Sequence, residues 1–221
     1  MEKPGIGRRT AFACISVLCL LLLAQTAPES GSKSGEIPSE SIAARIVRAA
    51  RAEVAKRTLY REEYLALKYP GGDVPQGTGV CTDLVIRALR AIGVDLQKEL
   101  HEDRAGHPEA YPTDIWAEKR PDRNIDHRRC QNLCVWFRRF TQSLPIQTDE
   151  QSLKKYWLPG DIVFFVRPGQ IHPWHVAVVS DKKAADGMPL IIEGYPVWFS
   201  EFRRLDDWAP IHSHFRVERI P

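Results

Sequence analysis

The chain has 221 residues, of which 43% are hydrophobic and 27% charged, and its formal net charge is +3. This composition is typical of a globular protein and excludes a disordered, collagen-like or many-span membrane chain. The length fits one domain with at most a small addition. Residues 1–27 carry most of the net positive charge, so the rest is nearly neutral and no nucleic acid is expected as a partner.

The N-terminus has the pattern of a secretory signal. Arg8 and Arg9 precede an apolar run from Ala11 to Leu23, and small or polar residues follow it. The run is too short to span a bilayer, and a basic start with a small-residue exit is typical of export. Gln25 stands where cleavage requires a small residue, so cleavage and retention as a membrane anchor through residues 11–24 are two alternatives. Both predict an exported protein of the periplasm or cell envelope.

A linker and a helix are predicted to follow this segment. Residues 28–38 consist almost entirely of Pro, Glu, Ser, Gly and Lys, as in a solvated linker. From Ser39 to about Tyr69, apolar residues recur on one helical face, which predicts a helix. The stretch 69–79 is rich in glycine and proline and is expected to hold no regular element.

A second helix is predicted directly after this loop, with Cys81 in its first turn. Apolar residues recur at helical spacing over 84–92, and Gly93 stands at a C-cap position. Residues 100–125 are polar, are broken by His107-Pro108 and Tyr111-Pro112, and are expected to be irregular. A third helix is predicted over 126–140, with Asp126 as its possible N-cap. Its inward-facing residues are predicted to be Leu133, Trp136, Phe137 and Phe140.

Short β-type runs dominate the last third of the chain, separated by Gly, Pro and Asp turns. The predicted strands cover residues 162–166, 175–179, 190–192 and 214–217. Helices first and strands later predict an α+β domain with an antiparallel sheet.

Three cysteines remain if the two in the apolar N-terminal run are set aside: Cys81, Cys130 and Cys134. An odd number in an oxidising compartment leaves at least one thiol unpaired. Cys130 and Cys134 lie four residues apart on one face of a predicted helix, where bridging geometry is poor but not excluded. Cys81 is then the unpaired thiol, and the state of the other two stays open.

Cys81 is a candidate nucleophile because amide groups at a helix N-terminus lower the pKa of a thiol there. The alternative is a small buried residue at the start of a core helix. His175 opens a strand whose other members are apolar, and it could form a Cys–His pair with Cys81. Glu193, at the end of the next strand, could hold the second imidazole nitrogen. The structural alternatives are a core histidine and an exposed strand-end carboxylate.

The order of these motifs resembles the NlpC-type cell-wall cysteine peptidases of the papain-like superfamily. Tyr69, two glycines and Cys81 come first, then Pro-Gly-Asp before a hydrophobic strand, then His175 before the next strand. The wider pattern is similar to an exported bacterial family of uncharacterised function, domain of unknown function family 1287. The resemblance covers roughly residues 45–219 and implies a papain-like, NlpC-type fold.

The resemblance also implies roles for single residues. Cys81 would be the nucleophile, His175 the general base and later acid, and Tyr69 would assist the oxyanion through its hydroxyl. The third polar position falls on Glu193, where related families more often place a histidine or an amide. Thr82 follows the cysteine in place of the usual serine.

Other polar clusters in the sequence are candidate binding sites. Arg128 and Arg129 could grip a substrate carboxylate, although a partly buried ion-pair network is favoured for them. The pairs His172 with His175, His212 with His214, and Cys130 with Cys134 have no established zinc spacing. No metal and no cofactor are therefore expected.

These observations together predict three segments: a signal or anchor over 1–27, a linker over 28–38, and a single papain-like domain over 39–221. The predicted function is that of an exported cysteine hydrolase that cleaves amide bonds in peptidoglycan peptides. An amidase or transacylase acting on another lipid or peptide conjugate is an alternative within the enzymes. A non-catalytic envelope-binding or peptidoglycan-binding module on the same fold is the alternative from another class, with a periplasmic metal-binding protein as the third.

Overall fold

The computed structural model describes residues 40–116, 120–208 and 210–219. The compact unit comprises Ser39–Pro221, and the expected signal or anchor and the linker lie outside the described residues. Within the described ranges, no helix is both long and apolar enough to cross a membrane.

The described residues of this unit form five α-helices and eight short or medium strands. The helices are α1 (Ile42–Ala55), α2 (Cys81–Arg90), α3 (Leu96–Gly106), α4 (Cys130–Phe140) and α5 (Glu150–Tyr156), with 3-10 turns η1 (Pro108–Ala110) and η2 (Asp126–Arg128). The strands are β1 (Leu59–Tyr60), β2 (Thr78–Gly79), β3 (Gln142–Leu144), β4 (Ile162–Val166), β5 (Pro173–Lys183), β6 (Pro189–Gly194), β7 (Phe199–Ser200) and β8 (Ile211–Arg216).

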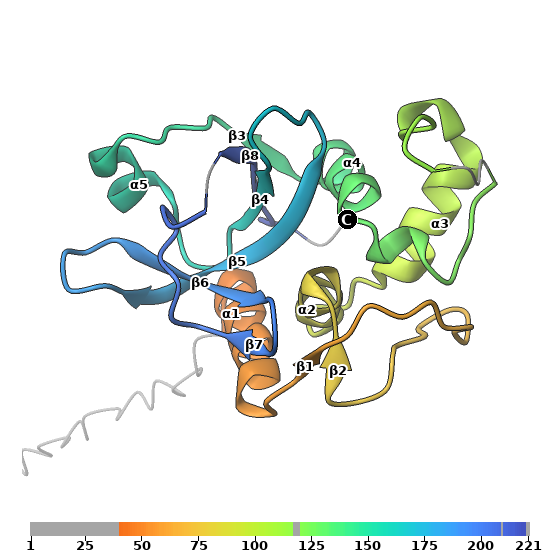
Figure 1. Ribbon diagram of the computed structural model, residues 1–221, viewed down its shortest axis with the longest axis horizontal. Helices are drawn as coiled ribbons and strands as arrows, with labels where there is room; N and C mark the ends of the chain where they lie inside the picture. The colour runs from red at the N-terminus through yellow and green to blue at the C-terminus, as the bar shows by residue number, and fades with distance from the viewer. Residues whose placement is uncertain (1–39, 117–119, 209, 220–221) are drawn as a thin grey trace, which may run out of the picture. The chain divides into compact units, whose positions relative to one another are not determined.

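The main sheet is six-stranded and antiparallel, in the order β3-β8-β4-β5-β6-β7. The predicted α+β class with an antiparallel sheet is confirmed. All four predicted strands are present as β4, β5, β6 and β8, and Figure 1 shows them crossing the left half of the molecule. The strands β1 and β2 form a separate parallel pair.

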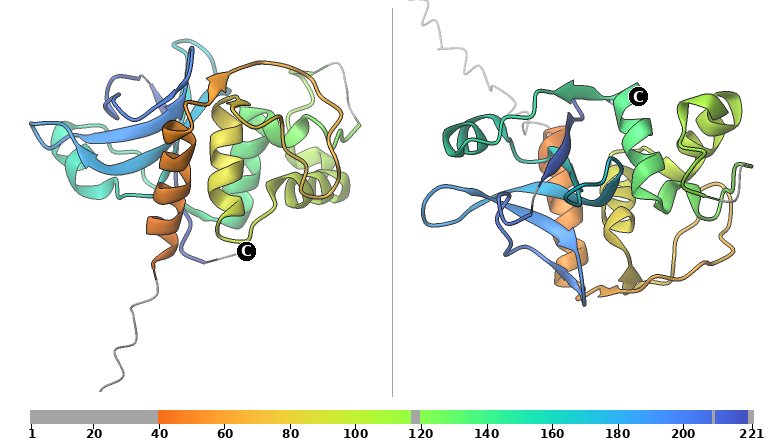
Figure 2. Two further views of the ribbon diagram at one scale, coloured as in Figure 1. Left: turned by 90° about the horizontal axis from the view of Figure 1, so that it is seen from below. Right: turned by 45° about the horizontal axis from the view of Figure 1, so that its top comes forward.

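Both faces of the sheet are buried, which explains why β4 reads as a continuous apolar run. Phe164 and Val176 face a core shared with the helices, whereas Val163 and Ala177 face a second core on the other side. Helices α1, α2 and α4 all pack against β5. Figure 2 shows α1 and α2 side by side next to the sheet. The second core is closed by Leu153 of α5 and by Trp157, Met188 and Leu205.

The predicted helix from Ser39 to about Tyr69 is correct only in its first half. Helix α1 begins after the N-cap Ser41, whose hydroxyl accepts a hydrogen bond from Ala44, and it ends at Ala55. Arg57 then adopts a left-handed conformation, with φ of 55°, and the chain becomes extended. The β-forming pair Leu59–Tyr60 gains backbone partners from β2 and from Val197, which a continued helix would lose.

The expectation of irregular structure over 100–125 is also wrong at its beginning. Helix α3 occupies 96–106, with Asp95 accepting a hydrogen bond from Gln97 at its N-terminus. Polar residues dominate this helix because it buries a narrow face, and buried Arg104 forms an ion pair with buried Asp126.

The predicted helix over 126–140 is divided in two. Residues 126–128 form the turn η2 and α4 begins at Cys130, so Asp126 does not cap an α-helix. Its carboxylate instead binds the backbone N–H of Asp122 and the side chains of Arg104 and Arg129. Leu133, Trp136 and Phe137 face inward as predicted, whereas Phe140 is 41% exposed.

Candidate active site

Cys81 is the first residue of α2, as predicted, and it contacts the core and a surface groove together. The Asp83 carboxylate accepts a hydrogen bond from the backbone N–H of Val80, at 2.7 Å, which fixes the start of the helix. Gly79 passes so close to Asp83 and Phe199 that an added Cβ would lie 3.1 and 3.2 Å from their side chains. A side chain at position 79 would therefore make Asp83 or Phe199 shift by a few tenths of an ångström beside Cys81.

The pKa of the Cys81 thiol is lowered to about 5. The largest cause is a hydrogen bond from the Cys130 thiol, whose sulfur lies 3.7 Å from the Cys81 sulfur. Burial opposes ionisation, while His175 and the backbone N–H of Val176 favour it. The N-terminus of α2 adds partial positive charge at the same place. Cys81 is therefore suited to carry a negative charge.

His175 lies near the start of β5 and is fully buried. Its Nε2 lies 2.7 Å from Oε2 of Glu193 on the neighbouring strand β6. The register that pairs Val178 with Ile192 makes His175 and Glu193 diagonal neighbours on one face of the sheet. The interactions with Cys81 and Glu193 outweigh burial and raise the pKa of His175 to about 9.

The second ring nitrogen of His175, Nδ1, is buried and has no hydrogen bond of ordinary geometry within the described residues. The interaction between the imidazole and the Cys81 thiol is therefore looser than a formed hydrogen bond. Such a contact is common in a thiol–imidazole pair without substrate. The structure thus brings Cys81, His175 and Glu193 together, as the sequence predicted.

Glu193 is held by more donors than the imidazole alone. Arg203 Nε donates to Oε1 at 2.5 Å, and Trp208 Nε1 donates to Oε2 at 2.7 Å. The Arg203 guanidinium also lies over the Trp208 ring, 4.5 Å from its centroid. Burial opposes ionisation of this carboxyl, but its pKa is lowered overall by His175, Arg203 and Trp208. The structural alternative of an exposed strand-end carboxylate does not hold for this residue.

Tyr69 does not reach this site. Its hydroxyl donates to Glu102 at 3.3 Å, and its ring packs edge-on against His101 of α3. Tyr60 of β1 instead lines the groove beside Cys81. Burial, followed by the negative charge of Cys81, raises the pKa of Tyr60, so its hydroxyl stays protonated beside the thiolate.

Arg128 is engaged in the structural network that the sequence favoured for it. Its Nε and Nη2 donate to the two carboxylate oxygens of Asp83, each at 2.9 Å, and its Nη1 donates to the backbone carbonyl of Glu63. Arg129 lies over the Trp116 ring and donates to Asp126. Both arginines line the groove, but Arg128 is held away from substrate by a buried fork of hydrogen bonds.

We expect replacement of Arg128 by alanine to lower the free energy of unfolding by about 3–5 kcal/mol, because Asp83 would keep a buried charge without its partner. Denaturant unfolding followed by tryptophan fluorescence measures this loss. Arg204→Ala is the control, since Arg204 forms exposed ion pairs with Asp186 and Asp206, and its unfolding midpoint should change little. Equal midpoints for the two variants would contradict the structural role of Arg128.

The paired histidines and cysteines do not converge on a metal. His172 faces Asp114, His212 faces Ser213, and His214 binds Asp161. In the part of the chain that the structure describes, no group of three or more His, Cys, Asp or Glu side chains could hold a metal ion.

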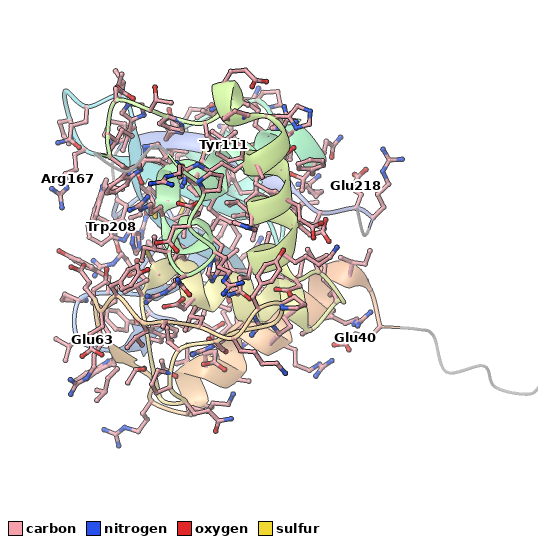
Figure 3. All side chains as sticks on the ribbon, turned by 90° about the vertical axis from the view of Figure 1, so that its right-hand side faces the viewer. Glu40, Glu63, Tyr111, Arg167, Trp208 and Glu218 are labelled. Atoms are coloured by element: carbon pink, nitrogen blue, oxygen red, sulfur yellow. The ribbon has the colours of Figure 1, made fainter. Side chains whose placement is uncertain are left out.

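The groove beside Cys81 has a volume of about 790 Å³. Its walls combine aromatic rings with charges of both signs, and Arg167 lies over the Trp174 ring with its guanidinium 4.6 Å from the centroid. Figure 3 shows two lining residues, Arg167 and Glu63, toward the top and bottom of the left edge in that view. Its remaining lining residues include Tyr60, Glu62, Tyr64, Trp116, Cys130, Gln131, Gln170 and Tyr195.

Sequence reasoning missed Cys130, Tyr60, Arg203 and Trp208. Cys130 could have been suspected, because it begins a helix as Cys81 does and the cysteine count is odd. The other three carry no spacing signal, since their proximity depends on how separate strands and loops fold together.

The fold and site define an α+β protein with a buried Cys–His–Glu arrangement at the edge of a groove. The chain belongs to the family described as "Domain of unknown function (DUF1287)", whose model matches residues 47–217. It is similar to "Uncharacterized protein YijF" of Escherichia coli (strain K12), with 42% identity over 167 residues that cover 76% of this chain and 78% of that protein. No solved structure matches the chain.

Proposed function

We propose that the protein is a cysteine hydrolase that cleaves amide bonds, with Cys81 as nucleophile. The observation that carries this proposal is the charge arrangement: a thiol of lowered pKa at a helix N-terminus faces a histidine of raised pKa. Between these two pKa values the thiolate and the imidazolium coexist. This is the ground state from which a cysteine hydrolase acts.

The proposed reaction begins with attack of the Cys81 thiolate on an amide carbonyl. The backbone N–H of Cys81 at the helix start would stabilise the oxyanion. The Tyr60 hydroxyl, which donates to Glu62 at 3.0 Å without substrate, would join it by turning from Glu62 to the oxyanion. His175 then gives its proton to the leaving amine, and an acyl-enzyme remains. Water, deprotonated by His175, attacks the acyl carbonyl, the C–S bond breaks, and the acid leaves with the Cys81 thiolate and the His175 imidazolium restored. Glu193 keeps the proton on Nε2 when the imidazole is neutral, so that Nδ1 can accept the next one.

The arrangement of elements supports a papain-like fold for this site. The nucleophile begins helix α2, which packs on the antiparallel sheet, and the histidine lies near the start of β5, the strand that α2 contacts. The order of the motifs along the chain also matches the NlpC-type pattern.

We further propose peptidoglycan or other envelope peptides as substrates. The groove supports an extended peptide, because aromatic faces and charges of both signs can hold its backbone and its carboxylate and ammonium groups. The pattern of the N-terminus supports an exported protein of the periplasm or envelope, where such peptides occur. If this segment were retained, residues 11–24 would anchor the protein to the membrane.

The test is hydrolysis of a panel of stem and cross-bridge peptides, with new amino termini detected by mass spectrometry. We expect cleavage by the reduced protein and a loss of at least about 10³-fold in Cys81→Ala, in line with removal of a nucleophile. Cys134→Ala is the matched control and should retain activity, because the Cys134 sulfur faces Ser213 and His212 instead of the groove. Peptide binding without turnover, unchanged in Cys81→Ala, would contradict hydrolysis and favour a binding module.

A further inference from the structure

The site contains two thiols in contact. Cys81 begins α2 and Cys130 begins α4, and the two sulfur atoms lie 3.7 Å apart. Both side chains are buried, with 5% and 6% exposure, yet both line the groove. A disulfide requires the sulfurs to approach to about 2 Å. The remaining distance is short enough for a change of side-chain torsion and a small shift of the helix ends.

The two thiols differ in their protonation. The pKa of Cys130 is raised, because its thiol donates to the Cys81 sulfur and because burial disfavours its thiolate. Cys81 is thus the sulfur that reacts with electrophiles, and Cys130 holds a proton directly beside it. A reactive thiolate next to a second thiol is the arrangement in which an oxidised sulfur is captured before it oxidises further.

The third thiol is turned away from this pair. Cys134 lies one helical turn after Cys130, and its sulfur is 3.5 Å from the Ser213 hydroxyl and 3.8 Å from Nδ1 of His212. The disulfide that the sequence left open between Cys130 and Cys134 is absent, and all three thiols are free. Helix α4 therefore presents only Cys130 to Cys81.

We propose that Cys130 is a resolving thiol and that hydroperoxides modify the site by converting Cys81 and Cys130 into a disulfide. In the first step the Cys81 thiolate attacks a peroxide oxygen, the O–O bond breaks, and Cys81 becomes a sulfenic acid while hydroxide or alkoxide leaves. In the second step the Cys130 sulfur attacks the Cys81 sulfur, the S–O bond breaks, and water leaves with the Cys130 proton. Cys81 and Cys130 together lose two electrons, and the peroxide gains them.

The disulfide removes the nucleophile and protects it at the same time. A dithiol reductant restores both thiols by exchange. Oxidation of Cys81 to a sulfinic acid, in contrast, is not reversed by such a reductant. This modification uses the same thiolate as the proposed hydrolysis but needs no peptide substrate. Its test can therefore succeed or fail independently of the proposed function.

The experiment treats the reduced full chain with hydrogen peroxide and maps its tryptic peptides by mass spectrometry. Cys81 falls in the peptide 69–87, and Cys130 shares the peptide 130–138 with Cys134. We expect these two peptides to become linked, with the loss of two hydrogens, and to separate again after treatment with dithiothreitol. Cys134→Ser removes the ambiguity within the second peptide, and we expect the link to form in this variant as in the wild type.

In Cys130→Ser we expect no disulfide and further oxidation of Cys81. The introduced hydroxyl can donate to Cys81 but cannot form a disulfide, so Cys81 should accumulate sulfenic acid, trapped by dimedone, and then sulfinic acid. The wild-type chain should form at least about 10-fold less sulfinic acid at the same peroxide dose. The proposal is overturned if wild-type Cys81 reaches sulfinic acid as fast as Cys130→Ser, or if the link forms between Cys81 and Cys134. The mapping of the wild-type chain decides the question even if Cys130→Ser does not fold.

Discussion

Alkylation of Cys81 by iodoacetamide is expected to follow a titration with its midpoint near pH 5, far below the value of about 8.5 for a free thiol. The thiolate is the reactive form, and Cys130, His175 and the N-terminus of α2 all stabilise it. Cys130 should stay unmodified over the same range because its pKa is raised. The rate at each pH is read from the peptide that carries Cys81, so the other thiols do not enter the measurement.

In His175→Ala the midpoint should rise by about 1–3 pH units, which is the effect of one neighbouring opposite charge. The midpoint is a better readout than the rate at one pH, since a thiolate of higher pKa is intrinsically more nucleophilic and partly compensates in rate. His172→Ala is the matched control, because His172 lies three residues earlier and faces Asp114. A midpoint near 8.5 in the wild type, or one that ignores His175, would contradict the Cys–His pair.

The same two pKa values set the pH range of the proposed hydrolysis. Activity should rise as Cys81 loses its proton and fall as His175 loses its own above about pH 9. Above that value the leaving amine lacks a proton donor, although the thiolate persists. In His175→Ala the alkaline fall of any residual activity should disappear, which separates His175 from other groups that titrate nearby.

The sheet and the helix that carries Cys81 could be predicted because their sequences have one dominant local signal. Strand β4 is apolar throughout since both of its faces are covered, and α2 has a clear stripe between a glycine-rich loop and Gly93. The predicted ends of the helices were wrong where contacts with distant residues outweigh the local sequence pattern. The chain after Ala55 has enough apolar spacing to continue as a helix, but Leu59 and Tyr60 gain more from pairing with β2 and Val197.

The main residues of the candidate site could also be predicted from the sequence, but their contacts could not. Cys81 begins a helix and His175 lies near the start of a strand, and a polar residue at such a position can be recognised from the sequence alone. Glu193 could be named because it ends the strand after His175, although nothing in the sequence indicated its contacts with Arg203 and Trp208. These contacts join β6 to a loop ten or more residues later.

Tyr69 and Tyr60 show where sequence order misleads. Tyr69 stands at the position that the motif order suggests, but its loop runs toward α3 and places the hydroxyl on Glu102. Tyr60 reaches the groove through a parallel pairing of two residues, too short to predict. Arg128, two residues before Cys130, binds Asp83, two residues after Cys81, and this contact between η2 and α2 keeps the two cysteines together. Such a tertiary contact has no local pattern in the sequence.

Glu193→Gln is expected to reduce the proposed hydrolysis by about 10²–10⁴-fold while changing side-chain volume very little. The carboxylate accepts from three donors, and an amide has only one oxygen to offer. If the amide oxygen faces His175 and Trp208, its NH₂ group opposes Arg203. If the NH₂ group faces His175 instead, Nε2 must become an acceptor and the imidazole proton moves to Nδ1. The nitrogen that faces Cys81 can then no longer accept the thiol proton.

The loss should appear mainly in kcat, with a lower pKa on the alkaline limb because the imidazolium loses its carboxylate partner. Glu201→Gln is the matched control: Glu201 binds Arg51, Lys182 and Ser180 and has no contact with the His175 ring. Both variants remove a carboxylate held by several donors, so a shared loss of activity would indicate general destabilisation. A loss in Glu193→Gln alone, with an alkaline limb moved to lower pH, assigns Glu193 to the orientation of His175. Full activity in Glu193→Gln would show that Arg203 and Trp208 hold a structural carboxylate and that His175 needs no third residue.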